Sequence, residues 1–445
     1  MNMLETKLKE IAIQKAISLY GEKLPPQILN RIEHELNIIA QNKWTDAYLL
    51  LNELLASKCI YPHEYALRGF GWNSFVAYLL GILPNINPLP AHYRCPKDNY
   101  SNFNVNMHHE KFGIELPDKC CPICGSIMLK DGWSLPIELL MEQTSDTTTK
   151  RQLIIQIDTS TSLRRKLLGR ISDQCLDMSR YKFSITDWKI YDILSSLPNI
   201  NMICYEDSNV IKVFQTSESI GLSYRTNRGF PLGTRGITYD DEDKIAEILL
   251  ETNPQNFSEL VKVAGIYHGT GIWTQEIKHD IINRRMQIST LLSCCEDVFE
   301  LLLAHNIEGN LALRITKLIS KGMGINKDDE SLLIKHGIAS SDIAYLKRLL
   351  YLFPRVRLIQ IAQHMWWMAY HKIYNPSIFY DMFFKIHSSK ELIHIISCGW
   401  ETVHREVSKM YDDCRYNSMG FNIEKKKLLE LALEMFARGY SLTCE

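Results

Sequence analysis

The chain has 445 residues, of which 50 are lysine or arginine and 51 are aspartate or glutamate, so its formal net charge is −1 at pH 7. This balance excludes a protein that binds nucleic acid through a surface that is basic all over, and it excludes a strongly acidic tail. Any site for a polyanion must therefore come from local segregation of charge. Hydrophobic residues make up 46% and charged residues 23%, which excludes a globally disordered chain, and the length suffices for roughly two to four domains.

The first 90 residues are predicted to form a helical region. Apolar residues recur at helical spacing through residues 4–58, and a Leu-Pro-Pro break at 24–26 separates the first two helices. An apolar run at 75–83 is also expected to be helical. Prolines and asparagines interrupt the sequence after it, so no membrane span is expected. The polar first ten residues lack the apolar segment of a signal peptide, which favours a cytoplasmic protein.

Residues 91–132 have the composition of a small knuckle that a metal holds together, rich in cysteine, histidine, asparagine and glycine. Cys121-Pro-Ile-Cys124, followed by glycine, is typical of one half of a zinc ribbon. The upstream half offers only Cys95, in Cys95-Pro-Lys-Asp98. We therefore expect Cys95, Asp98, Cys121 and Cys124 to hold a structural Zn²⁺, although a knuckle with free thiols is the alternative. The fourth ligand stays open to four other residues: Cys120, His92, His108 and His109.

Beyond the knuckle, residues 151–158 are the clearest strand of the first half. Residues 159–200 are expected to be polar and irregular, and they include the basic run Arg164-Arg165-Lys166 and Arg170. From about residue 205 onward, segments of helical period alternate with glycine, asparagine and proline, so this part is predicted to be almost wholly helical.

A basic and aromatic stretch lies between residues 343 and 380, where no aspartate or glutamate occurs. Its five cations are Lys347, Arg348, Arg355, Arg357 and Lys372, and tryptophans and tyrosines are interleaved among them. Cations for phosphates with aromatic faces between them favour the binding of nucleotides or single strands. The alternative interpretation is that the aromatic residues form a helix core and the cations a solvated face.

Short motifs along the chain carry a resemblance to one known family, and they occur in the order that they have in that family. They are Asn87–Pro96, Leu116–Gly125, Lys130–Gly132, Phe257–Val261, His268-Gly269-Thr270, Tyr351–Arg355, Ala369–Lys372 and Arg438–Tyr440. Together they resemble a truncated and degenerate version of the polymerase part of PolC-type DNA polymerase III alpha subunits, the replicative polymerase of low-GC Gram-positive bacteria. The resemblance covers residues 20–158 and 185–445.

The resemblance implies both a domain order and a set of binding residues. Residues 1–90 would be a helical thumb and palm-entry region, 91–132 the cysteine knuckle, 133–200 a reduced α+β palm remnant, and 201–445 a large helical fingers-like domain, which makes the fold mostly α. Ten residues are expected to contact nucleotide or DNA: Arg68, Gly69, Ser74, His268, Gly269, Thr270, Arg348, Arg355, Arg357 and Lys372.

The palm differs from that of the family at the residues that bind the catalytic metal ions. The family carries an Asp-x-Asp pair on one strand and a third aspartate on a later strand, and these hold two Mg²⁺ ions. Here Gln156 stands at the first position and Ser184 near the third, which leaves Asp158 as a catalytic remnant. A neutral amide cannot replace the charge of a carboxylate toward Mg²⁺, so no Mg²⁺ cofactor is expected. The resemblance places the family's phosphate-binding Gly/Ser loop at residues 66–74, where larger residues, Leu67, Phe70 and Trp72, replace small ones.

These departures favour a catalytically inactive pseudo-polymerase that acts by binding. It would contact DNA weakly and a replisome or polymerase-regulating protein more strongly, as a decoy or modulator of the replicative polymerase encoded on a mobile element. Two alternatives are a minimal active DNA polymerase or nucleotidyltransferase that uses Asp158, and a protein-interaction module without DNA binding.

Overall fold

The computed structural model describes eleven stretches of the chain: residues 2–61, 65–68, 73–83, 85–105, 112–138, 153–158, 161–173, 181–186, 204–238, 242–416 and 422–442. The fold is mostly helical, as the sequence predicts, with two small three-stranded sheets in the first half. None of the helices in these stretches is both long enough and apolar enough to cross a membrane.

The N-terminal region begins with three helices, α1 (Met3–Tyr20), α2 (Pro26–Gln41) and α3 (Thr45–Ala56). Asn2 and Glu5 form a capping box at the start of α1, and a proline begins α2. Residues spaced by four in α1, from Leu8 to Tyr20, are buried against α2, α3 and the short helix α4 (Phe75–Leu79). The helical pattern predicted for residues 4–58 and the apolar run that follows is therefore confirmed.

The first sheet has the order β1–β5–β6, with β1 (Tyr65–Arg68) antiparallel and β6 (Tyr181–Thr186) parallel to the central strand β5 (Leu153–Asp158). Because parallel neighbours need a crossover, the chain between β5 and β6 contains a helix, α5 (Thr161–Asp173). The expectation of an irregular segment at 159–200 is wrong for these residues. Leu167 and Ile171 bury one side of α5, and the four cations around them hide that period in the sequence.

The second sheet has the order β3–β2–β4 and carries the cysteine knuckle, with β2 at His92–Arg94, β3 at Ser101–Asn102 and β4 at Leu129–Asp131. It has a small core of its own, which includes Tyr93, Leu116 and Met128. Gly132 follows β4 with a φ of +96°, and a Cβ there would lie 2.3 Å from the Pro90 carbonyl oxygen. Only glycine allows this close approach of two backbone segments.

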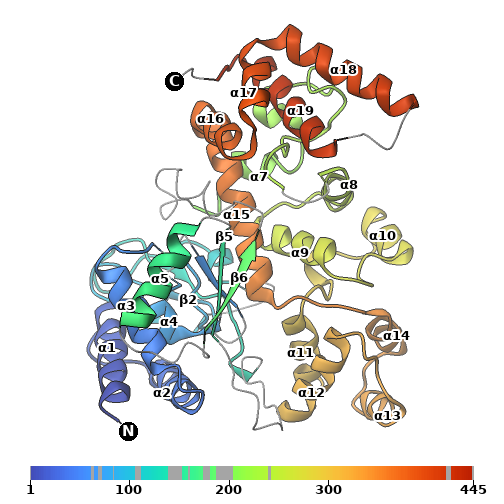
Figure 1. Ribbon diagram of the computed structural model, residues 1–445. Coiled ribbons are helices and arrows are strands. Elements are labelled where there is room, and N and C mark those ends of the chain that lie inside the picture. Colours follow the sequence, from blue (N-terminus) through green and yellow to red (C-terminus); the bar gives the residue numbers. More distant parts are fainter. Residues whose placement is uncertain are drawn as a thin grey trace.

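From residue 204 onward the described chain is helical. Its helices are α7 (Ser208–Lys212), α8 (Glu242–Thr252), α9 (Phe257–His268), α10 (Gln275–Ile282), α11 (Cys295–Ala304), α12 (Gly309–Ser320), α13 (Lys327–Lys335), α14 (Ser340–Arg348), α15 (Arg355–Tyr374), α16 (Pro376–His387), α17 (Lys390–Ser397), α18 (Trp400–Tyr416) and α19 (Ile423–Ala437). The long helix α15 runs through the middle of the molecule, with α1–α5 on one side and α8–α14 on the other (Figure 1). It packs along α9 and contacts α7 and α16, so it positions the whole second half.

Candidate functional site

The knuckle brings four potential metal ligands together. Cys95 and Asp98 lie in the turn after β2, and Cys121 and Cys124 lie in the turn before β4. One ligand atom from each of Cys95, Asp98, Cys121 and Cys124 lies within 4.8 Å of all the others. The Sγ atoms of Cys95 and Cys124 are 3.5 Å apart, and Cys121 Sγ lies 3.2 Å from an Asp98 carboxylate oxygen.

The two halves of the knuckle have the same local geometry. The Lys97 backbone N–H points at Cys95 Sγ and the Ile123 N–H at Cys121 Sγ, each at a nitrogen–sulfur distance of 3.4 Å. Backbone N–H groups two residues after a cysteine orient its sulfur toward a shared ion. Hydrogen bonds from the Cys124 thiol and then the Tyr100 N–H hold the pKa of Asp98 well below its usual range, so this carboxylate stays ionised.

Three sulfur atoms and one carboxylate fit a four-coordinate metal site, since zinc takes thiolate and carboxylate ligands in a tetrahedral set. The alternative ligands are placed elsewhere or lie outside the described residues. Cys120 is exposed and forms an isolated backbone bridge with Ile127, outside the cluster. His92 is buried between Tyr20 and the Pro90 carbonyl. His108 and His109 are not among the described residues.

The palm positions lie side by side on β5 and β6. The parallel register pairs Gln156 with Ser184 and Asp158 with Thr186. Gln156 and Ser184, which the resemblance places at the family's first aspartate and near its third, are therefore direct neighbours in the sheet. Asp158 is the last residue of β5, and its side chain is outside the described part of the structure.

The residues predicted to bind phosphate in the first half, Arg68, Gly69 and Ser74, differ in their structural context. Arg68 is the last residue of β1 and pairs with Ile154, whereas Gly69 lies outside the described residues. Ser74 is the N-cap of α4, where its hydroxyl accepts from the Ala77 N–H at 3.1 Å and donates to Glu35 at 2.8 Å. The buried Glu35 also accepts from the first two backbone N–H groups of α4, so Ser74 has a structural role in starting this helix.

Arg355, at the first position of α15, is almost completely buried among carboxylates. Its guanidinium donates to Glu300 at 2.6 Å and to Asp297 at 3.2 Å, both on α11, and to the Ser134 carbonyl at 3.1 Å. The Arg355 backbone N–H donates to Glu296 at 2.6 Å. This cation therefore has its partners inside the protein and ties α15 to α11 and to the segment after the knuckle.

Lys372, near the other end of α15, is fully buried. Its ammonium lies 2.7 Å from Glu434 of α19 and donates to the carbonyls of Gly233 and Arg235 at 2.8 and 2.6 Å. Burial lowers the pKa of Lys372 to about 8, although the charge of Glu434 opposes this shift. Arg348 is half-exposed and forms an ion pair with Glu276.

The interpretation of a solvated cationic face is thus wrong for Arg355, Arg357 and Lys372, because all three are buried. The helix-core half of that interpretation is confirmed for Trp366, Trp367 and Met368 of α15, which are buried, but it is wrong for Tyr374, which is exposed. The sequence gives no local signal for the carboxylate partners, because Asp297 and Glu434 lie 58 and 62 residues from Arg355 and Lys372.

His268 and Arg357 share one electrostatic environment with His364. Burial and then the charge of Arg357 lower the pKa of His268 to about 4 and that of His364 to about 3, so both imidazoles are neutral at pH 7. Gly269 ends α9, and the Thr270 backbone pairs with Tyr351 four residues ahead of α15. The predicted residues His268, Gly269, Thr270 and Arg357 therefore gather where α9 meets α15.

Comparison with known proteins finds a matching family model for part of each half of the chain. Residues 6–167 match the family described as bacterial DNA polymerase III alpha NTPase domain, and residues 187–303 match the bacterial DNA polymerase III alpha subunit finger domain. The DNA polymerase III PolC-type of Caldanaerobacter subterraneus subsp. tengcongensis is 24% identical over 99% of this chain and 38% of its own length. Those of Thermotoga petrophila and Bacillus subtilis are each 25% identical over 98% of this chain.

The chain spans less than two fifths of the length of these relatives. The first alignment runs over 540 positions although the chain has 445 residues, so many positions of the relative have no counterpart here. The two family matches together take in more than half of the residues, and the PolC-type relatives align with nearly all of them. The chain therefore belongs to the bacterial DNA polymerase III alpha family and is similar to its PolC-type members.

Proposed function

We propose that this protein is a catalytically inactive relative of the PolC-type polymerase that works by binding, as a decoy or modulator of the replicative enzyme. The observation that carries the proposal is the pairing of Gln156 with Ser184 on adjacent parallel strands. Two-metal phosphoryl transfer needs carboxylates that bridge or hold both ions. An amide and a hydroxyl at these neighbouring positions supply no negative charge for Mg²⁺, so Asp158 is the one carboxylate that the described strands β5 and β6 carry.

The proposal assigns weak DNA contact to the exposed face of α5. Arg164, Arg165, Lys166 and Arg170 are all exposed there. Lys166 of α5 donates to the Cys59 carbonyl, just after α3, at 3.4 Å, and Figure 1 shows α5 on the same side of α15 as the first three helices. The buried cations Arg355 and Lys372 are neutralised by internal carboxylates, so they add little to an external field for phosphates. A chain that is neutral overall would then rely on a replisome or polymerase-regulating protein as its main partner.

The knuckle is proposed to hold one structural Zn²⁺ through Cys95, Asp98, Cys121 and Cys124. The donor set supports a closed four-coordinate site, because three sulfurs and one carboxylate complete a tetrahedron. When bound, the ion would cross-link the two halves of the knuckle and would leave no open position for chemistry.

A primer-extension assay tests the proposal. The full chain, incubated with a primed template, the four deoxynucleotides and either Mg²⁺ or Mn²⁺, is expected to give no extended product, and Asp158→Ala is expected to behave identically. Template-dependent extension that is abolished by Asp158→Ala would overturn the proposal in favour of a minimal polymerase.

A further inference from the structure

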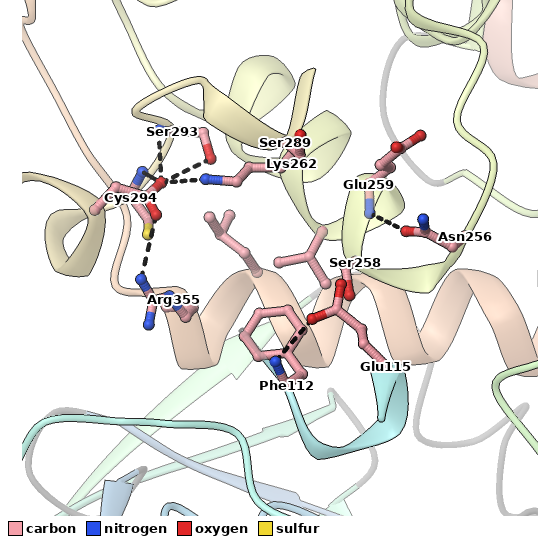
Figure 2. Close-up of a pocket in the computed structure, with 13 residues that line it drawn as sticks. Phe112, Glu115, Asn256, Ser258, Glu259, Lys262, Ser289, Ser293, Cys294 and Arg355 are labelled. Atoms are coloured by element: carbon pink, nitrogen blue, oxygen red, sulfur yellow. Dashed lines mark hydrogen bonds and ion pairs between the residues drawn. The ribbon is translucent and has the colours of Figure 1, made fainter. Parts of the chain in front are cut away.

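A crevice of about 530 Å³ opens between the knuckle segment and the fingers-like helices. Its walls are the turn η3 (Gly113–Glu115), residues 205–211 and the start of α9. A smaller cavity of about 60 Å³ adjoins it and shares several lining residues, among them Glu115, Ser258 and Glu259. Figure 2 draws this smaller cavity, with Glu115 reaching up from η3 and with Ser258 and Glu259 coming from the start of α9. The volume of the crevice, about 530 Å³, is within the range of ligand sites.

The floor of the crevice is aromatic. Tyr205 and Phe257 lie with their ring centroids 4.5 Å apart, and Trp366 lies 5.7 Å from Phe257. Ile114 and Ile211 add aliphatic surface to the walls. Phe257 and Trp366 are almost completely buried beneath the floor, so the half-buried Tyr205 and Ile114 provide the apolar surface from which an inserted side chain displaces water.

The rim of the crevice is acidic. Among the residues that line it, every ionisable group that carries charge at pH 7 is a carboxylate: Glu115, Glu206, Asp207 and Glu259. Burial raises the pKa of Glu259, and the like charge of Glu115 adds to this effect. No lysine, arginine or histidine is among the lining residues. Glu206 already forms an ion pair with Lys130, so the field of the rim comes mainly from Glu115, Asp207 and Glu259. This field repels a nucleic-acid backbone or a triphosphate and attracts a cation.

One polar atom in the lining lacks a partner within the described structure. The Ser258 hydroxyl is buried and makes no hydrogen bond to the described residues. A hydroxyl held out of water without a partner costs free energy, which a hydrogen bond from an inserted group would recover.

We infer that the crevice docks a short basic, amphipathic segment of a partner protein. An aliphatic side chain of this segment lies on the floor of Tyr205, Phe257 and Trp366, and a lysine or arginine next to it lies between Glu115 and Glu259. The inference rests on the proposed function, in which the chain works by binding, and it specifies the chemistry of the partner.

Fluorescence anisotropy with two labelled octapeptides tests this inference on the full chain. One peptide alternates leucine with lysine and the other alternates leucine with glutamate. We expect the lysine peptide to bind and the glutamate peptide to bind at least tenfold more weakly. The variant Glu115→Gln/Glu259→Gln keeps the oxygen acceptors for Phe112 N–H and Gln255 N–H and is expected to weaken binding of the lysine peptide about tenfold, which corresponds to about 1.4 kcal/mol.

A matched control is available at a second hollow of about 400 Å³, which Glu5 of α1 and Glu33 of α2 line. Glu5→Gln/Glu33→Gln removes the same charge elsewhere and is expected to leave binding unchanged. Hydrogen exchange should show protection at residues 255–259 when the lysine peptide is bound. Thermal unfolding of each variant verifies that it is folded.

Equal binding of the two peptides, an equal loss in both double variants, or displacement of the lysine peptide by a sixteen-nucleotide single strand would each overturn the inference. The test of the crevice and the test of the proposed function can fail independently of each other. Extension of a primer together with crevice-dependent peptide binding would contradict the inactive assignment alone. Absence of extension together with equal binding of the two peptides would contradict the crevice alone.

Discussion

Arg355 at the start of α15 and Asp297 in the first turn of α11 form an ion pair at 3.2 Å, and their side chains are only 2% and 1% exposed. The resemblance predicts that Arg355 contacts nucleotide or DNA. Here Asp297 also accepts from Lys262 and from the Ser293 backbone, so the carboxylate is the centre of a buried network. The network joins α9, α11 and α15 into one unit.

Removal of the Arg355 charge is expected to destabilise the fold strongly. Arg355→Met would leave Asp297, Glu300 and Glu296 near one another without their shared cation, at a cost of about 3–5 kcal/mol in the free energy of unfolding. Arg348→Met removes a half-exposed pair and should cost about 0–1 kcal/mol. Urea denaturation compares the two variants, and an equal small loss in both would contradict the assigned role of the network.

The knuckle is expected to bind one zinc ion per chain. Elemental analysis of the purified protein should give this ratio, and Cys124→Ser and Asp98→Ala should each lower the zinc affinity by on the order of 100-fold, because a ligand is lost. Cys120→Ser is the matched control, since this neighbouring thiol lies outside the cluster, and it should retain the metal. Zinc loss in Cys120→Ser with retention in Asp98→Ala would show that the assignment of Asp98 as the fourth ligand is wrong.

Acid is expected to destabilise the protein through His268 and His364. The folded-state pKa values of about 4 and about 3 lie below the ordinary value of 6.5. As the pH falls below 6.5, the unfolded chain binds protons on these rings before the folded chain does, so the stability that neutral imidazoles provide is lost toward pH 4. Each histidine should contribute about 1–3 kcal/mol to this loss.

Unfolding of His268→Gln and His364→Gln between pH 7 and pH 4 measures this contribution. Each variant should show a shallower decline in stability than the parent, whereas His279→Gln, at an exposed position of α10, should follow the parent curve. Parallel curves for all four proteins would argue against the linkage.

Binding to DNA is expected to depend on α5. Reversal of Arg164, Arg165, Lys166 and Arg170 to glutamate should abolish the salt-dependent part of the affinity, which for four phosphate contacts has a slope of about −3 to −4 in log K against log salt. Lys347→Glu/Arg348→Glu removes two cations that already have carboxylate partners and should change the slope by less than one unit. An unchanged slope after the α5 reversal would exclude this helix as the contact surface.

The sequence predicts those parts of the molecule whose signals are local. The helices of the first 60 residues follow from their period, and the knuckle cluster follows from the spacing of Cys121 and Cys124. Helix α5 is missed because arginines flank its two buried apolar residues. The network around Arg355 and the acidic crevice could not be predicted, because their members come from segments far apart in the chain and meet only through tertiary packing.

Mn²⁺ titration followed by electron paramagnetic resonance tests most directly the proposal that Gln156 and Ser184 leave the palm without a metal site. With the knuckle loaded with zinc, the parent protein and Asp158→Ala are predicted to give the same free-Mn²⁺ curve. Gln156→Asp/Ser184→Asp is predicted to gain a site, because the β5–β6 register places the new carboxylates side by side. An Mn²⁺ site in the parent protein that disappears in Asp158→Ala would contradict the account.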